Sequence, residues 1–445
     1  MYKRKVEKVL QSWLSDTFHK PLVVKGVRQC GKTSSVMDFA TRNFKHVVYL
    51  DFREHPDYKK FFTPNLEVDS IIMRITAAMP DAEIVPGETC FVFDEIQDCP
   101  KARGSLKYFH QDGRYEVMCT GSLLGVNGYK TPEEKKEEEE ASIPVGFEDI
   151  VEMYPMDFEE WLWANGIRSM HIDYLWKCLR EETRVEDAIH ERFRELLHQY
   201  VVVGGMPEVV TTFMETKQIG KVLAVQRRIV DEYKADMVKY ALSADKSRIR
   251  ECFESVPAQL AREYKKFSYT VVRRGGRGRD YAGSLQWIED AGIIRRCYNT
   301  EITELPLEGH KIKSEFKVYM SDIGLFISML EDGSQSSILA GDLLTYHGAI
   351  MENLVADIFG KMGRKLYYYH KDGGVELDFL MRYKGECMPV ECKATTGNAK
   401  SMRTVLKHPE KYHVASGMKL GDHNVGNNEQ LLTLPMYMAF LLTEV

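Results

Sequence analysis

The residues best suited to chemistry near the start of the chain are a lysine and a hydroxyl residue that follow a glycine-rich turn. Residues 26–33 fit the pattern G-x-x-x-x-G-K-[ST], after an apolar run and before a helical pattern. Main-chain N–H groups at a helix start bind phosphates; Lys32 would reach the β- and γ-phosphates, and Thr33 would hold Mg²⁺. The predicted cofactor-binding residues are Gly26, Val27, Arg28, Gln29, Cys30, Gly31, Lys32, Thr33 and Ser34.

A second group is the acidic pair Asp94–Glu95, which ends the apolar run in residues 90–98. Ligands of open parallel sheets bind outside the carboxyl ends of the strands. We therefore expect Asp94 to hold Mg²⁺ with Thr33, and Glu95 to orient or activate the attacking water. The predicted catalytic residues are Glu95, Asp94 and Lys32.

Hydroxyl residues end the next apolar run, residues 115–122. Thr120 or Ser122 would sense the γ-phosphate. The alternative is that either residue simply caps the following helix.

A third chemical group lies near the C-terminus, in residues 375–394, where two apolar runs flank a Lys-Gly turn typical of a two-residue hairpin. Counting outward from the turn places Tyr383 opposite Glu386, Asp378 opposite Glu391, and Glu376 opposite Lys393. Like charges that face each other on a sheet destabilise it, and a divalent cation would remove that cost. The pattern predicts a Mg²⁺ or Mn²⁺ site between Asp378 and Glu391.

Two features of this hairpin leave alternatives open. Pro389 cannot donate a hydrogen bond, so it needs an outward-facing position, an edge or a bulge, and a bulge would shift the register by one residue. A solvent-facing hairpin with a Glu376–Lys393 cross-pair would also explain the residues without any metal.

The apolar runs and helical patterns around these groups predict an α/β protein. The length of 445 residues suggests roughly three domains. The net charge is −6, so nucleic-acid binding would need a local basic patch. No apolar run is long enough to cross a bilayer, no signal peptide is evident, and the nine cysteines form no paired C-x-x-C set. We expect a cytoplasmic protein with reduced thiols and no membrane partner; homo-oligomerisation stays open.

A basic stretch in residues 262–279 carries seven Lys or Arg residues against one acid. Helical patterns precede and follow it, and a strand pair ends near residue 322, which is the order of a winged helix. The predicted contacts to double-stranded DNA are Arg273, Arg274, Arg277 and Arg279. The alternative is a winged helix used for protein contact.

Taken together, KGVRQCGKT, FVFDEIQD, MCTGS and MYPMDFEEWL resemble the prokaryotic archaeal-ATPase-like group of AAA-type ATP-binding proteins. The resemblance implies a P-loop parallel sheet with a helical lid, ATP and Mg²⁺ as cofactors, and a C-terminal domain similar to PD-(D/E)XK nucleases. It places Gly205 and Pro207 of the lid, with Gly204, near the adenine, although a plain turn between helices explains them too. In the nuclease-like site it groups Glu352, Asp378, Glu391 and Lys393.

The expected organisation is an ATPase core (1–155), a helical lid (156–220), a winged-helix module (221–325) and a nuclease-like α/β domain (340–445). The expected function is an ATPase that gates a DNA-acting C-terminal region. The alternative is an ATP-dependent regulatory switch whose C-terminal domains only dock partners. Three arginines are candidates for an arginine finger by position alone, namely Arg53, Arg103 and Arg114.

Overall fold

The computed structural model describes residues 2–123, 146–240, 245–341, 348–371, 374–393, 400–428 and 430–443. Unit 1 consists mainly of Met1–Pro155, and unit 2 of most of Met156–Val445. The glutamate-rich run that the sequence shows at residues 129–142 lies outside the described residues. None of the described helices is long and apolar enough to span a membrane.

Unit 1 is built on a five-stranded parallel sheet with strand order β2-β3-β4-β1-β5. Its apolar runs are short and continuous, as expected for strands buried on both faces. The carboxyl ends of the strands therefore meet at one edge of the sheet. The strands are β1 Leu22–Gly26, β2 His46–Asp51, β3 Thr89–Asp94, β4 Glu116–Ser122 and β5 Asp149–Met153.

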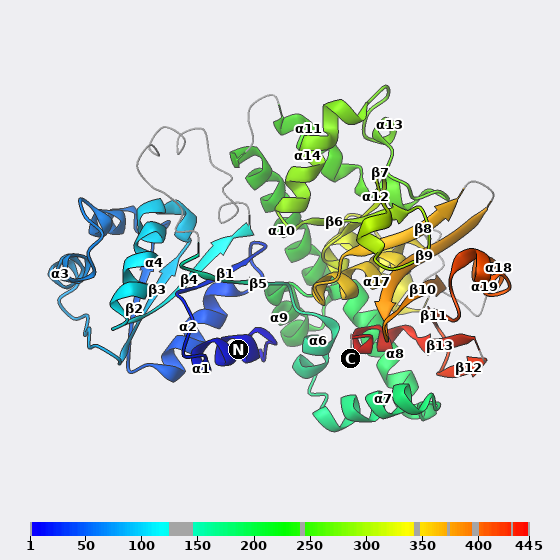
Figure 1. The fold of residues 1–445 in the computed structure, drawn as a ribbon, viewed down its shortest axis with the longest axis horizontal. Coiled ribbons are helices and arrows are strands. Elements are labelled where there is room, and N and C mark those ends of the chain that lie inside the picture. The colour runs from blue at the N-terminus through cyan, green and yellow to red at the C-terminus, as the bar shows by residue number, and fades with distance from the viewer. Residues whose placement is uncertain are drawn as a thin grey trace. The chain divides into compact units, whose positions relative to one another are not determined.

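Alternate residues of each strand enter two separate cores. In β3, Phe91 and Phe93 join one apolar cluster while Cys90 and Val92 join the other. Helices α1 and α2 supply the second cluster and helices α3 and α4 the first, so the unit is a three-layer sandwich (Figure 1). The helices are α1 Val6–Ser15, α2 Lys32–Asn43, α3 Val68–Ala78 and α4 Pro100–Asp112, with 3₁₀ turns η1 Pro56–Phe62 and η2 Ile96–Asp98.

Unit 2 begins with a series of helices, and several of them pack on elements from much later in the chain. Helix α8 packs on α15 and α16, and α6 packs on η5, whose residues come near the end of the chain. The helices are α6 Phe158–Ala164, α7 Ser169–Glu181, α8 Asp187–Val203, α9 Pro207–Thr216, α10 Ile219–Tyr240, α11 Lys246–Glu254, α12 Val256–Leu260, α13 Tyr269–Val272, α14 Gly278–Asp290, α15 Ile323–Ser328 and α16 Ser334–Leu339.

A mixed eight-stranded sheet with order β12-β13-β11-β10-β9-β8-β6-β7 forms the rest of unit 2. The strand pair expected to complete a separate winged helix, β6 and β7, belongs to this sheet, because β6 also pairs with β8. The strands are β6 Ile294–Thr300, β7 Lys311–Met320, β8 Leu366–Lys371, β9 Val375–Tyr383, β10 Glu386–Lys393, β11 Gly417–Gly421, β12 Gly426–Asn428 and β13 Leu431–Pro435.

Helix α17, Ala349–Lys361, lies in the interior of unit 2. Every one of its residues is buried. It contacts strands of the sheet and also α15 and η5, so no side faces water. The remaining elements are η4 Leu307–His310, α18 Lys400–Leu406, α19 Pro409–Tyr412 and η5 Met436–Leu441.

Candidate functional site

The glycine-rich loop joins β1 to α2, and the backbone explains both of its glycines. A Cβ on Gly26 would lie 2.2 Å from the carbonyl oxygen of Met153 in β5, so strand packing requires glycine there. Gly31 has a φ of 93° and directly precedes Lys32, the first residue of α2. Gln29 also has a left-handed φ, of 61°. The loop therefore curves into the helix start, where main-chain N–H groups have no helical partner.

Arg4 braces this loop, and the sequence analysis missed it. Its guanidinium donates to the carbonyl of Cys30 at 2.9 Å and to the carbonyl of Tyr154 at 2.7 Å. These partners are far from Arg4 in the sequence, so no local pattern signals the contact.

The side chain of Lys32 is buried over the loop. Its ammonium donates to the carbonyl oxygens of Gly26 at 3.2 Å and Val27 at 2.9 Å. A bound phosphate would offer the ammonium charged acceptors, which form stronger hydrogen bonds than neutral carbonyls.

The carboxylate of Asp94 accepts hydrogen bonds from hydroxyl groups on α2, β2 and β4. Its Oδ1 accepts from Thr33 Oγ1 at 3.1 Å and from the hydroxyl of Thr120, and its Oδ2 accepts from the hydroxyl of Tyr49 at 2.7 Å. Burial, together with the nearby Asp94 carboxylate, raises the pKa of Tyr49 far above its usual value, so the phenol stays a neutral donor. Thr120 therefore lies at the Asp94 carboxylate, whereas the N–H of Ser122 bonds the side chain of Gln97 at 3.3 Å.

The predicted Mg²⁺ ligands, Thr33 and Asp94, are in direct contact. Both offer oxygen atoms, the ligands that Mg²⁺ prefers. The residues therefore fit the ion, which would neutralise phosphate charge when bound.

Glu95 follows Asp94 with a left-handed φ of 53°, which turns its side chain out of the strand. Arg53 Nη2 lies 2.6 Å from Glu95 Oε2, and Arg53 Nε lies 2.9 Å from Asp98 Oδ2. The amide of Gln97 also donates to Glu95. The residue expected to orient water is thus held by two neighbours.

The other two arginine-finger candidates have different settings. Arg103 forms a buried bidentate pair with Glu148, at 2.6 and 3.0 Å. Arg114 pairs at the surface with Asp69 and Asp112. Of the three arginines, Arg53 is the one that contacts Glu95.

Comparison with protein families agrees with this geometry. Residues 18–162 match the family model described as AAA domain. This part of the chain is an AAA-type ATPase domain. Residues 194–336 and 347–437 match two models described only as domains of unknown function, DUF8612 and DUF4143. A search of curated proteins finds no match.

Solved structures resemble the chain only distantly. A Walker-type ATPase of Pyrococcus abyssi aligns with 74% of this chain and 96% of its own, at 14% identity and a TM-score of 0.42. AMPPCP-bound DnaA from Aquifex aeolicus aligns with 65% of this chain and 87% of its own, at 11% identity and a TM-score of 0.27. A signal-transduction ATPase with numerous domains from Pyrococcus horikoshii aligns with 80% of this chain and 48% of its own, at 10% identity and a TM-score of 0.26.

The glycine pair expected near the adenine packs inside unit 2. A Cβ on Gly205 would lie 1.9 Å from the carbonyl oxygen of Met156, and one on Gly204 would lie 2.3 Å from Asp322 Oδ1. The N–H of Gly205 donates to Asp322 Oδ2 at 2.8 Å. Pro207 starts α9 directly afterwards. These contacts explain the turn without a nucleotide.

Asp322 belongs to a buried ionic group that also involves α17. Lys361 Nζ lies 2.9 Å from Asp357 and 3.3 Å from Asp322, and it donates to the hydroxyl of Tyr200 at 3.0 Å. Burial, with the nearby charge of Asp322, raises the pKa of Asp357 to about 7, although Lys361 acts in the opposite direction.

The C-terminal hairpin has the register that counting predicts from the turn to Phe379–Val390, where the pairing of the two strands ends, before the expected pairs Asp378–Glu391 and Glu376–Lys393. Tyr383 pairs with Glu386, and the pairing continues without a shift through Pro389 to Val390. No bulge is needed, because alternation from a hydrogen-bonded first pair turns the missing N–H of Pro389 away from β9. The pairing of β10 with β11 begins one residue later, at Val390.

The acidic residues of this hairpin lie in a charged cluster with partners the sequence analysis missed. Glu352 binds Lys265 at 2.6 Å and Lys317 at 3.3 Å, and Lys317 also binds Glu376 at 2.7 Å. Despite its burial, these lysines lower the pKa of Glu352 to about 2. Lys265 is therefore not available to the basic stretch in which the sequence places it.

Asp378, Glu391 and Lys393 form the other side of the cluster. Asp378 accepts from the N–H of Cys392 at 2.8 Å, and Lys393 lies 2.8 Å from Glu391 Oε1. Burial and the charge of Glu352 raise the pKa of Asp378 to about 7. Glu391 Oε2 is buried with no hydrogen-bond partner. Within the described ranges, no group of three or more His, Cys, Asp or Glu side chains is arranged to hold a metal ion.

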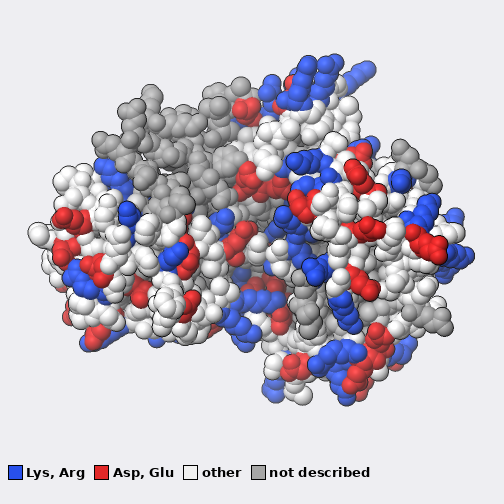
Figure 2. All heavy atoms as spheres, viewed as in Figure 1, with Lys and Arg blue, Asp and Glu red and all other residues white. Residues whose placement is uncertain are grey.

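The four predicted DNA contacts lie on the surface around α13 and at the start of α14. Arg273, Arg274, Arg277 and Arg279 are all exposed. Figure 2 shows a group of Lys and Arg side chains in the region where Figure 1 draws α13. By contrast, Arg296 in β6 is tied to Glu289 by a hydrogen bond of 2.6 Å, so it is not part of this exposed group.

Proposed function

We propose that the protein hydrolyses ATP with Mg²⁺ and uses the cycle to control DNA binding by unit 2. The observation that carries the ATPase part is the contact between Thr33 and Asp94 beside the loop of Lys32. Lys32 would bind the β- and γ-phosphates, Thr33 and Asp94 would hold Mg²⁺, and Glu95 would orient the attacking water. Thr120, through Asp94, would respond to the bound phosphates.

Two variants test the ATPase roles. Lys32→Ala should abolish ATP binding, and Glu95→Gln should bind ATP yet lose turnover, because only the water-orienting group is changed. The matched control for Lys32→Ala is Lys45→Ala, which removes an exposed lysine that pairs with Glu88. Normal ATP binding by Lys32→Ala would show that the loop does not bind phosphate.

The DNA part rests on the exposed arginines around α13. Changing Arg273, Arg274, Arg277 and Arg279 to Ala should weaken duplex DNA binding and flatten its salt dependence, by about one unit of slope for each phosphate that the variant no longer neutralises. A control variant would remove four exposed arginines elsewhere in unit 2: Arg184, Arg192, Arg228 and Arg250. An unchanged slope in the first variant would favour the alternative function, a regulatory switch whose unit 2 docks proteins.

A second candidate function is metal-dependent cleavage of DNA at the hairpin. The buried oxygen of Glu391 without a partner supports it, because an unpaired buried carboxylate oxygen costs free energy that a cation would recover. Asp378 and Glu391 would hold Mg²⁺ or Mn²⁺, Lys393 would stabilise developing charge, and Glu352 would support the site. We would measure melting temperatures of the parent and Asp378→Asn with and without metal, and cleavage of plasmid DNA. If the metal stabilises neither chain or both equally, and no DNA is cut, this candidate fails.

A further inference from the structure

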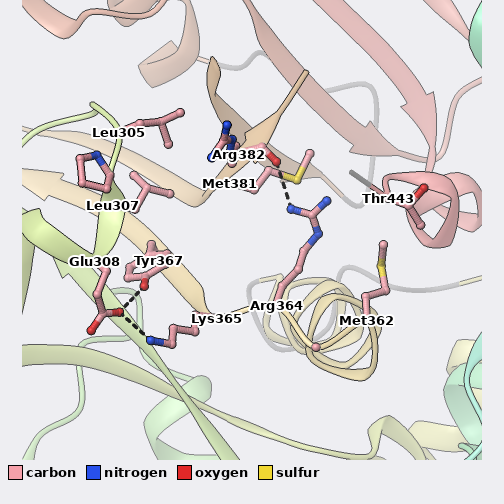
Figure 3. Close-up of a pocket in the computed structure, with 12 residues that line it drawn as sticks. Leu305, Leu307, Glu308, Met362, Arg364, Lys365, Tyr367, Met381, Arg382 and Thr443 are labelled. Atoms are coloured by element: carbon pink, nitrogen blue, oxygen red, sulfur yellow. Dashed lines mark hydrogen bonds and ion pairs between the residues drawn. The ribbon is translucent and has the colours of Figure 1, made fainter. Parts of the chain in front are cut away.

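Unit 2 contains a pocket that belongs to neither proposed activity. Its volume is about 500 Å³, within the range of roughly 300–1,000 Å³ that is typical of small-molecule sites. Residues 305–308, the turn between α17 and β8, and the end of β9 surround it (Figure 3). All of these segments lie within unit 2.

One part of the pocket wall is apolar. Leu307, Tyr367 and Met381 are buried residues that turn part of their surface toward the pocket, and Leu305 and Met362 complete this wall. A wall of this kind favours a ligand with an apolar body, since contact removes hydrocarbon surface from water.

Cationic groups occupy the other part of the wall. The guanidinium of Arg364 donates to the carbonyls of Arg382 at 3.0 Å and Leu442 at 2.7 Å, which fixes its position at the pocket (Figure 3). Arg382 is exposed, and its guanidinium has no partner among the described residues. Lys365 is the third cation of the lining.

Glu308 is the one carboxylate among the described residues of the lining, and it does not balance these charges. Glu308 binds Lys311 at 2.6 Å, the hydroxyl of Tyr367, and Lys365 at 3.3 Å. Hydrogen bonds from Lys311 and Tyr367 lower the pKa of Glu308 to about 2, so it stays ionised and engaged with these donors. The guanidinium of Arg382 can therefore pair with an anionic ligand.

We propose that this pocket binds a small organic anion, with a carboxylate, sulfonate or phosphate group carried on an apolar body. The anionic group contacts Arg364 and Arg382, and the body lies on the wall of Leu305, Leu307 and Met381. Inorganic phosphate alone would leave the apolar wall in water, and a cation would be repelled. The site therefore discriminates by combining charge with an apolar surface.

The probe for this test is 8-anilinonaphthalene-1-sulfonate, an aromatic sulfonate that fluoresces when it leaves water. Its neutral counterpart is N-phenyl-1-naphthylamine, which lacks the sulfonate. The full-length chain should bind the sulfonate at a saturable site. Arg382→Glu should weaken the sulfonate at least tenfold and the neutral dye less than twofold, because the substitution changes charge at an exposed position. Leu305→Trp, which fills the pocket, should weaken both dyes.

The matched control is Arg192→Glu, the same charge change at an exposed arginine outside the pocket. Competition with decanoate and with 1-naphthyl phosphate then identifies the preferred anionic group. Displacement of the dye by either compound supports the site and shows whether the site accepts a carboxylate or a phosphate. The proposal is overturned if neither displaces the dye, if Arg382→Glu binds the sulfonate like the parent, or if Arg192→Glu weakens its binding equally.

Discussion

The contact between Arg53 and Glu95 leads to a prediction about turnover. In the proposed mechanism Glu95 must be free to orient water, yet its carboxylate lies 2.6 Å from Arg53 Nη2. We therefore expect Arg53→Ala to increase the rate of ATP hydrolysis. The pair is partly exposed, at 34% and 22% of the two side chains, so solvent screens it. A pair of this kind contributes about 0.2–1 kcal/mol. Release of that energy corresponds to an increase in rate of about 1.4- to 5-fold.

The assay is phosphate release at saturating ATP, under steady-state and single-turnover conditions. Single turnover separates the chemical step from product release, which would otherwise hide an increase. Arg114→Ala is the control, because Arg114 forms its surface pairs away from Glu95 and its removal should leave the rate unchanged. A fall of tenfold or more in Arg53→Ala would refute the reasoning and would assign Arg53 to transition-state charge stabilisation.

Three further predictions concern stability. Gly205→Ala should lower the free energy of unfolding of unit 2 by about 1–3 kcal/mol, measured by urea unfolding, because the new Cβ would lie 1.9 Å from a carbonyl oxygen. Gly220→Ala is the control: it lies in a helix with open space around it, so it should raise the free energy of unfolding by about 0.5–1 kcal/mol. Arg103→Ala should cost about 3–5 kcal/mol in the same assay, because it leaves a buried carboxylate without its partner, and an unchanged midpoint would contradict that role. Because the pKa of Asp357 is raised to about 7, the folded chain keeps a proton that the unfolded chain releases near pH 4, so this group stabilises the fold at low pH and loses that effect as pH rises through 7. Melting temperatures from pH 5 to 8 should fall less steeply in Asp357→Asn, and equal slopes would mean that Asp357 does not carry this proton.

The sequence predicted those parts of the site that depend on neighbouring residues. The motif of residues 26–33 lies on a strand–loop–helix turn, and Asp94 ends β3, as the local patterns indicate; β4 lies between β1 and β3 in the sheet. The hairpin register near the turn could also be predicted, because the two turn residues determine the pairs from Tyr383–Glu386 to Phe379–Val390.

Contacts between distant segments could not be predicted from the sequence. Arg4 donates to the carbonyl of Tyr154, and Lys265 and Lys317 bind Glu352, although nothing near these residues in the sequence signals a partner. The pairing of β6 with β8 in the large sheet was missed for a related reason. The hydrophobic pattern of β6 shows that it is a strand, but not that β8, which lies more than sixty residues later, pairs with it.

The packing of α6 against η5 has a consequence for biosynthesis. The rings of Phe158 and Phe440 lie 5.8 Å apart, although 282 residues separate them in the sequence. A ribosome that adds about 5–20 residues per second needs on the order of 14–56 s to make the chain between them. Unit 1 can close its sheet once β5 has left the exit tunnel, while the first helices of unit 2 expose apolar faces until synthesis nears its end. We therefore expect chaperones to bind the nascent chain during this interval, and synonymous codons that change the speed of translation to change the yield of folded protein.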